Sequence, residues 1–385
     1  MLETPLDPNR SATHAENDRR PLDRRAGGRP PATARCPSSG YLKWFVLLGL
    51  ASFALCWLYV ALAPMTFMDA EYPRWRAKET LLARCDFGAF AVVGDSRAAV
   101  DIAPVRLPMR VTNLALAGTT PIETYVMVAR ALRCAQPPPA IIISISPSHV
   151  AAPDTFWGKS VRYGFLSLRD LFLLRDISLR LHNTDVLQPE PPDGLSITPR
   201  ILLYEARFPA LYFGSLYHNV PFLPYRDNQA LYAKVLRSRG QYYFASRAGP
   251  TAIGPEGELR DFVAQPVLDA YFNRILALTA SRGIPVYFIA MPLDADTYDA
   301  VPPAEKRHFA DYLRRYAAKY PNFHVATEPL PHWPNRYFAD WLSHMNPTGV
   351  AVFNRMLAQC LARIATKSMT LGSEPACPLG TAPPG

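Results

Sequence analysis

A long uncharged run near the N-terminus constrains this chain more than any other feature. Trp44–Met68 contains no charged residue and is dominated by Leu, Phe, Ala and Val. Its length of about 25 residues exceeds the ~20 that an α-helix needs to cross the hydrocarbon core of a bilayer. A cleaved signal peptide is the alternative, but such a peptide has a shorter apolar region that starts earlier. We therefore expect a transmembrane helix over residues 41–68.

The charges on either side of this run predict its orientation. Asp69 and Glu71 follow it, whereas basic residues precede it: Arg19, Arg20, Arg24, Arg25, Arg29, Arg35 and Lys43. Because the cytoplasmic flank of a span is enriched in Lys and Arg, we expect a cytoplasmic N-terminus and an outward-facing remainder after Ala70. Residues 1–40 are rich in Pro, Arg, Ser and Ala and are expected to form a disordered cytoplasmic tail.

The overall charge and the lack of metal-binding motifs limit the kinds of partner and cofactor that we expect. The net charge of +9 comes mostly from scattered arginines, which favours an anionic membrane surface or polymer over nucleic acid. The chain contains no Cys-x-x-Cys motif and no His cluster, so we expect no metal and no cofactor.

Four cysteines follow the apolar run, where an oxidising compartment would allow disulfides. Cys85 precedes the first predicted strand and Cys134 precedes a later one, so neighbouring parallel strands would bring these two to the same sheet edge. We expect a Cys85–Cys134 disulfide and, by elimination, a Cys360–Cys377 disulfide. Free thiols are the alternative.

Strand and helix patterns alternate after the apolar run, which is typical of an α/β fold with a parallel sheet. The continuous apolar strands predict a parallel sheet covered on both faces. Residues 69–150 and 264–366 are its two parts, separated by a long aromatic-rich insertion at 151–263 and followed by a disordered tail at 367–385. The expected strands are Phe87–Val93, Val111–Leu116, Ile141–Ile145, Val286–Ala290 and Phe323–Val325.

Two short motifs suggest a catalytic triad. The first strand ends in Gly94-Asp95-Ser96, and Asp340 and His344 share a loop before the last helix. A serine needs a base to remove its proton, and the base needs a third group to orient it. Ser96 is thus the candidate nucleophile, His344 the base and Asp340 its orienter. The alternatives are a serine that caps the next helix and an aspartate that pairs with an arginine such as Arg336.

Neighbouring residues complete the predicted site. The backbone amides of Ser96 and Gly118 are candidate donors to an oxyanion, although Gly118 is also a plausible turn glycine. Arg97 is expected to be solvated or to face a phosphate, and His149 to be structural or to line the pocket.

These motifs resemble the conserved blocks of the SGNH (GDSL-type) hydrolase superfamily. Gly94-Asp95-Ser96 is similar to the first block, Asn113–Gly118 to the second and Asp340–Gly349 to the last. The resemblance implies a flavodoxin-like three-layer α/β fold. It also implies catalytic roles for Ser96, His344 and Asp340 and an oxyanion role for Gly118. The third block, usually Gly-x-Asn-Asp, is replaced, and Ser146 or Ser148 would have to substitute for its asparagine.

The altered third block and the N-terminal anchor make the chain similar to members that modify cell-surface polymers, such as alginate O-acetylation proteins and DltD-like proteins of D-alanylation. The resemblance implies a serine acyltransferase in the bacterial inner membrane, with a periplasmic domain that passes an acyl group, such as acetyl, onto an exported polysaccharide. A multi-span membrane O-acyltransferase is the implied partner. An esterase or deacetylase that uses the same triad, and a non-catalytic partner of the membrane acyltransferase, are the alternatives.

Overall fold

The computed structural model describes residues 38–152, 156–188, 196–219, 222–242, 249–366, 377, 379 and 380. The chain divides into two compact units, Met1–Phe53 and Ala54–Gly385. The predicted cytoplasmic tail, residues 1–40, lies outside the described residues except for its last three, which are helical.

The apolar run forms one long helix, α1 (Ser38–Leu62). Within it, Gly40–Leu62 is 23 residues long, has a mean hydropathy of 2.3 and is long and apolar enough to cross a membrane. The structure therefore confirms a helix of sufficient length and hydropathy in the region predicted at 41–68.

The predicted end of this helix is wrong by six residues. Pro64 opens a 3₁₀ turn instead of continuing the helix, because proline has no N–H to donate. Phe67 and Met68 are fully buried in the main hydrophobic core. The last part of the uncharged run is apolar because it enters the core of the protein.

Five parallel strands form the central sheet, in the order β2-β1-β3-β4-β6. Numbered along the chain within this sheet, the order is 2-1-3-4-5, that of flavodoxin-like doubly wound sheets. Each strand overlaps a segment predicted as a strand, and only β1 extends beyond it, by one residue at Gly94. The strands are β1 (Phe90–Gly94), β2 (Val111–Asn113), β3 (Ile141–Ser144), β4 (Val286–Phe288) and β6 (Phe323–Val325).

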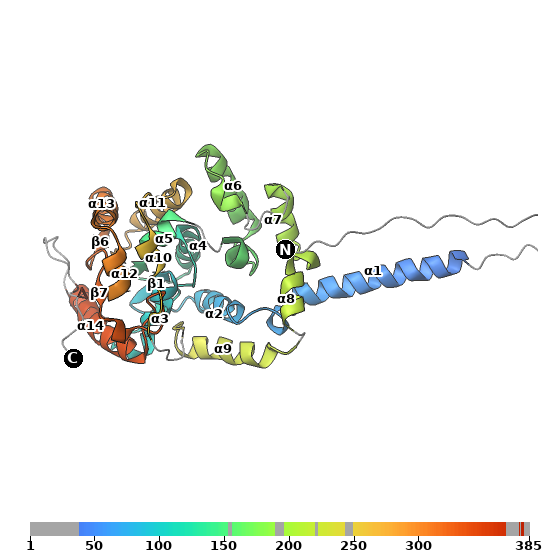
Figure 1. Cartoon of the computed structure of the whole chain (residues 1–385), viewed down its shortest axis with the longest axis horizontal. Coiled ribbons are helices and arrows are strands. Elements are labelled where there is room, and N and C mark those ends of the chain that lie inside the picture. Colours follow the sequence, from blue (N-terminus) through green and yellow to red (C-terminus); the bar gives the residue numbers. More distant parts are fainter. Residues whose placement is uncertain are drawn as a thin grey trace, which may run out of the picture. The chain divides into compact units, whose positions relative to one another are not determined.

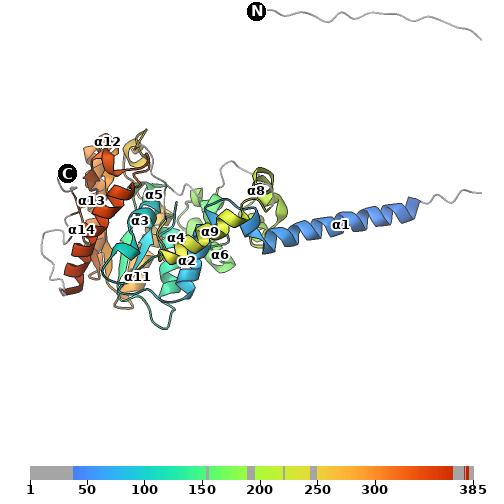
Figure 2. The same ribbon diagram turned by 90° about the horizontal axis from the view of Figure 1, so that it is seen from below.

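Helices cover both faces of this sheet (Figures 1 and 2). Because side chains alternate along a strand, Ala91 and Val93 of β1 join one hydrophobic cluster while Phe90 and Val92 join another. The first cluster includes residues of α4 (Pro121–Ala131), α11 (Pro266–Ala280) and α13 (Pro303–Lys319). The second includes residues of α3 (Ser96–Asp101) and α14 (Pro347–Thr366).

A second, two-stranded parallel sheet was not predicted. It pairs β5 (Leu293–Asp294) with β7 (His332–Trp333) and leads into α12 (Ala295–Ala300). Two-residue strands are too short to leave a periodic pattern in the sequence.

The insertion at 151–263 is mostly helical where it is described, and it is not a separate domain. Trp157 and Tyr212 belong to the same hydrophobic cluster as the sheet. Its helix α9 packs on α2 (Tyr72–Ala83), the helix that follows the apolar run. The α-helices of this region are α6 (Leu168–Arg180), α7 (Ile197–Glu205), α8 (Phe213–His218), α9 (Tyr225–Arg237) and α10 (Pro255–Glu258).

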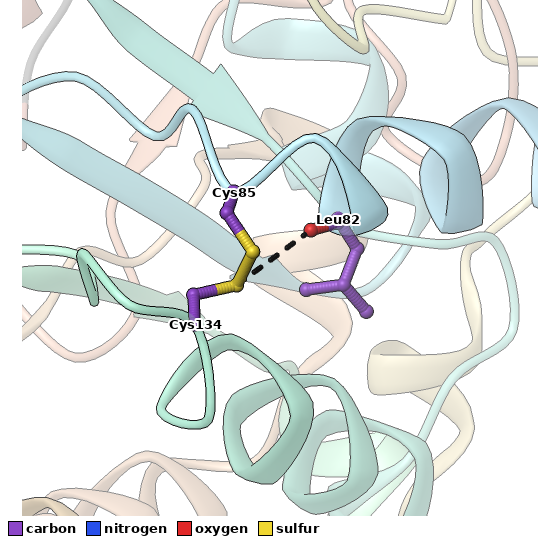
Figure 3. The surroundings of a disulfide bond; sticks show 3 residues. All are labelled: Leu82, Cys85 and Cys134. Atoms are coloured by element: carbon purple, nitrogen blue, oxygen red, sulfur yellow. Dashed lines mark hydrogen bonds between the residues drawn. A yellow bond between two sulfur atoms is a disulfide. The ribbon is translucent and has the colours of Figure 1, made fainter.

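Both predicted cysteine pairs are disulfides in the structure. Cys85 and Cys134 have their Cα atoms 5.6 Å apart and join the segment after α2 to the segment after α4 (Figure 3). Cys360 on α14 is bonded to Cys377, with Cα atoms 4.9 Å apart.

The second bridge corrects the prediction of disorder at 367–385. Cys377 and Leu379 are buried, Cys377 N donates to Ala326 O at 2.9 Å, and Trp333 Nε1 donates to Leu379 O at 3.0 Å. These residues are anchored on the domain. The remainder of that range, apart from Gly380, lies outside the described residues.

Candidate active site

The Gly94-Asp95-Ser96 turn begins at the carboxyl end of β1 and leads directly into α3. Gly94 has φ +137°, and a Cβ there would collide with Ser144 O of the neighbouring strand. Asp95 Oδ1 then accepts from Arg97 N at 3.1 Å and caps the helix. Ser96 is the first residue of α3 and is half-buried.

The strand order gives this turn its position in the fold. β1 lies between β2 and β3; the connection to β2 contains α3 on one face, and the connection from β2 to β3 contains α4 on the other. The gap between the carboxyl ends of β1 and β3 is therefore the topological switch point, where open α/β sheets bind their ligands. Ser96 follows β1 at this point, and Ser146, Ser148 and His149 follow β3.

Asp340 and His344 form the predicted hydrogen-bonded pair. Asp340 Oδ2 lies 2.8 Å from His344 Nδ1, and Asp340 Oδ1 accepts from Leu342 N at 3.0 Å and His344 N at 3.2 Å. Burial alone would raise the pKa of Asp340, but the hydrogen bond with His344, the charge interaction and the amide donors lower it. A carboxylate held ionised in this geometry orients the imidazole.

The loop that carries His344 is fixed on both sides. Met345 N donates to Asp101 Oδ1 at 3.0 Å, at the last residue of the helix that Ser96 begins. Ser343 has φ +58° and donates from Oγ to Asp294 Oδ2 at 2.7 Å. A non-glycine residue with positive φ is uncommon, and the bond to Asp294 offsets part of its cost. His344 itself is buried.

The predicted oxyanion glycine also lies beside the end of β1. Gly94 O accepts from Leu116 N at 2.9 Å and from Thr119 Oγ1 at 2.7 Å, which ties the loop after β2 to the strand that precedes Ser96. Gly118 lies within this loop at φ +71°, a conformation that favours glycine.

The two serines after β3, Ser146 and Ser148, which the resemblance offers in place of the missing asparagine, both contact charged side chains. Ser148 Oγ donates to Glu256 Oε1 at 2.9 Å, and Ser146 N donates to Asp95 Oδ2 at 2.9 Å. Ser146 Oγ lies 2.6 Å from His149 Nδ1. The hydroxyls of both serines and the amide of Ser146 bond to protein atoms. Through these bonds the serines help to position Asp95, His149 and Glu256 around the Ser96 turn.

Arg97 corrects another prediction. It is buried, and its Nη2 lies 2.8 Å from Glu256 Oε1 and 4.0 Å from Asp95 Oδ2. Burial would lower the pKa of Arg97, but the surrounding carboxylates raise it, so the guanidinium is charged. Glu256 is in the insertion, 159 residues away, so no local pattern could predict that the two residues pair.

Asp95 and His149 form a second acid–histidine pair next to Ser96. His149 Nδ1 lies 3.5 Å from the nearly inaccessible Asp95 Oδ2. Burial alone would raise the pKa of Asp95 and lower that of His149. Their mutual interaction, with help from Arg97 and the Ser146 amide, outweighs burial at Asp95 and lowers its pKa. The same interaction, with help from Glu256, raises the pKa of His149. His149 was predicted to be structural or pocket-lining; its contacts give it a role in holding the Ser96 turn.

The comparisons with known proteins add no family assignment. No family model matches the sequence, and no curated protein matches it. In the part of the chain that the structure describes, no group of three or more His, Cys, Asp or Glu side chains is placed to hold a metal ion.

Proposed function

We propose that this protein is a membrane-anchored, outward-facing SGNH-type acyltransferase that moves an acyl group, such as acetyl, onto an exported polysaccharide. The observation that carries the proposal is the Asp340–His344 pair, with 2.8 Å between Oδ2 and Nδ1, on a loop bonded to the helix that Ser96 begins. The motifs around Ser96, Gly118 and His344 supply the resemblance to that superfamily.

The reaction would use an acyl-serine intermediate. Ser96 Oγ attacks the acyl carbonyl and gives its proton to His344, and the leaving group of the donor takes that proton as the carbonyl–donor bond breaks. A sugar hydroxyl then attacks the acyl-serine and transfers its proton to His344. The new ester leaves as Ser96 regains a proton. Asp340 stabilises the imidazolium in both steps, and the amides of Ser96 and Gly118 would bind the developing oxyanion.

The apolar helix and the disulfides support the proposed location. Gly40–Leu62 is suited to an inner-membrane anchor, and two disulfides in the domain suit an oxidising compartment such as the periplasm. In this arrangement a multi-span membrane O-acyltransferase would supply the acyl group from the other side of the bilayer.

Ser96→Ala tests the proposal when the full chain is expressed in cells with the surface polymer. Ser281→Ala is the control, because Ser281 is exposed and its Oγ bonds only to Leu278 O among the contacts described. We expect Ser96→Ala to abolish labelling of the purified protein by a fluorophosphonate and to remove the acyl groups of the polymer, with no change for the control.

Two other outcomes distinguish the alternatives. Release of acetate from a model ester without any acyl transfer would indicate an esterase or deacetylase, which shares the acyl-serine step but uses water as acceptor. Unchanged polymer acylation in Ser96→Ala would contradict catalysis and indicate a non-catalytic partner of the membrane acyltransferase.

A further inference from the structure

The insertion exposes large apolar side chains on α8 and on the turn into α9. We call this group the α8–α9 surface; Tyr217 and Leu223 are 75% and 74% exposed, and the other members are Phe213, Phe222 and Tyr225. Phe213 and Tyr217 stack one helical turn apart, with ring centroids 6.4 Å apart. Exposed apolar groups gathered in one place mark an interaction surface.

Aromatic and backbone contacts attach this surface to the carboxyl end of α1. The ring of Phe222 lies 5.7 Å from that of Tyr59, and Phe222 N donates to Thr66 O at 2.9 Å. Asn228 Nδ2 donates to Met65 O at 3.0 Å and to Met68 O at 2.9 Å. These residues belong to one compact unit, which begins at Ala54.

A contact deeper in α1 brings the insertion to the level of the apolar span. Trp57 Nε1 donates to Ala206 O at 2.6 Å, and the Trp57 ring packs edge-on against Phe208 at 5.6 Å. Trp57 precedes the end of the span at Leu62 by about 7.5 Å along the helix axis, at ~1.5 Å per residue. An insertion segment that bonds to Trp57 therefore lies at the depth of the outer part of the span.

We propose that the α8–α9 surface lies in the lipid interface beside the carboxyl end of α1, as a second membrane contact. The inference rests on the proposed anchoring by Gly40–Leu62. Tyr217 and Tyr225 each combine an apolar ring with a polar hydroxyl, and tyrosine is enriched at the headgroup level for that reason. Leu58 and Leu62 of α1 are exposed. They lie within one helical turn of Tyr59, whose ring contacts Phe222, so the surface adjoins the exposed apolar side chains of the helix. That continuity favours lipid over a protein partner as the occupant.

Depth-dependent fluorescence quenching tests the proposal on the full chain in phosphatidylcholine nanodiscs. Single cysteines at Tyr217 and Leu223, introduced with Cys36→Ser and Cys56→Ser, would carry an NBD fluorophore while both disulfides stay in place. A label at Leu48, in the middle of the span, reports on the anchor. A label at Val263, which is 66% exposed in another part of the insertion, is the matched control for an exposed apolar side chain in water.

We expect lipids with a nitroxide near the headgroup to quench the labels at 217 and 223 several-fold more than the label at 263. Quenching at 217 and 223 no stronger than at 263, with strong quenching at 48 by a nitroxide deep in the chain, would overturn the lipid contact and leave the anchor intact. The surface would then be assigned to a protein partner. Absence of quenching at 48 would overturn the anchor and the lipid contact together.

Discussion

At the scale of single residues, Asp95 links the candidate nucleophile to the neighbouring strand. Its Oδ1 caps the helix that starts at Ser96, and its Oδ2 accepts from Ser146 N after β3. Arg97 and His149 supply the positive charges that keep this buried carboxylate ionised. The middle residue of the Gly-Asp-Ser motif therefore has a structural reason to be an aspartate, independent of any role in chemistry.

Asp340→Asn should lower the rate of fluorophosphonate labelling of Ser96 by roughly 10³–10⁴-fold, as expected when the carboxylate of a Ser-His-Asp triad loses its charge. The amide no longer favours the tautomer and charge that His344 needs as a base. Asp296→Asn is the control, because Asp296 is exposed on α12 and bonds to Asn335. Equal rates for Asp340→Asn and the wild type would remove Asp340 from the triad.

His149→Gln should destabilise the protein in a pH-dependent way. Because the pKa of His149 is raised from 6.5 in the folded state, the stabilisation by its charged form is fully present below about pH 6.5 and is lost as pH rises through the folded-state value. We expect a loss of about 1–3 kcal/mol in the free energy of unfolding at pH 6, as for a hydrogen bond to a charged group, and a smaller loss at pH 9.

Denaturant unfolding of the detergent-solubilised full chain measures this difference. His308→Gln is the control, because His308 and its partner Asp261 are more than half exposed, and exposed ion pairs contribute little. A loss for His149→Gln that is equal at pH 6 and pH 9 would contradict the ion pair with Asp95.

At the scale of elements, the regular parts of the fold could be predicted and the irregular ones could not. The apolar runs of β1, β3 and β4 are local signals, and the structure contains each of these strands. The small β5–β7 sheet is too short for such a signal. It nevertheless carries Asp294, which holds Ser343 next to His344.

The candidate site likewise contains residues that a local sequence signal predicts and residues that no local signal predicts. Ser96, Asp340 and His344 lie next to recognisable strand and helix ends, so the sequence can predict them as candidates, and the structure contains the hydrogen bond between Asp340 and His344. Glu256 contacts Arg97 across 159 residues from a region without clear periodicity, so only the folded chain reveals the pair. Arg97 was expected to be solvated or to face a phosphate. It is instead buried against Glu256, a partner that no local pattern indicates.

Gly94→Ala should disturb the junction between β1 and α3. The φ of +137° is unfavourable for alanine, and the added Cβ would push on Ser144 O. We expect a loss of about 2 kcal/mol or more in the free energy of unfolding, measured by denaturant titration, together with reduced labelling of Ser96.

Gly214→Ala is the matched control for this change. Gly214 is on α8, where an added Cβ meets nothing within 4 Å. We expect unchanged or slightly higher stability, since alanine favours a helix. A loss for Gly94→Ala no larger than that of the control would contradict the close approach of β1 and β3.

At the scale of the whole molecule, the two disulfides connect segments that are distant in the sequence. They close loops with sequence separations of 49 and 17 residues. Replacing Cys85 and Cys134 by serine should lower the free energy of unfolding by about 4 kcal/mol, and replacing Cys360 and Cys377 by about 3 kcal/mol, from the entropy of the opened loops.

Thermal unfolding of the full chain in detergent tests this order, with Cys56→Ser as the control, because Cys56 is exposed and unbridged on α1. Loss of the Cys360–Cys377 bridge should also expose Trp333, whose indole bonds to Leu379 O, and should shift its fluorescence. Stability unchanged by either double substitution would contradict a structural role for that bridge.

The short passage from α1 into the core has a consequence for where the chain could be lengthened. Only a 3₁₀ turn separates Leu62 from Phe67 and Met68, which are fully buried. A residue inserted into this turn would have no loop to absorb it and would displace the buried pair from the core. The junction should therefore tolerate insertions far less than an exposed surface loop does.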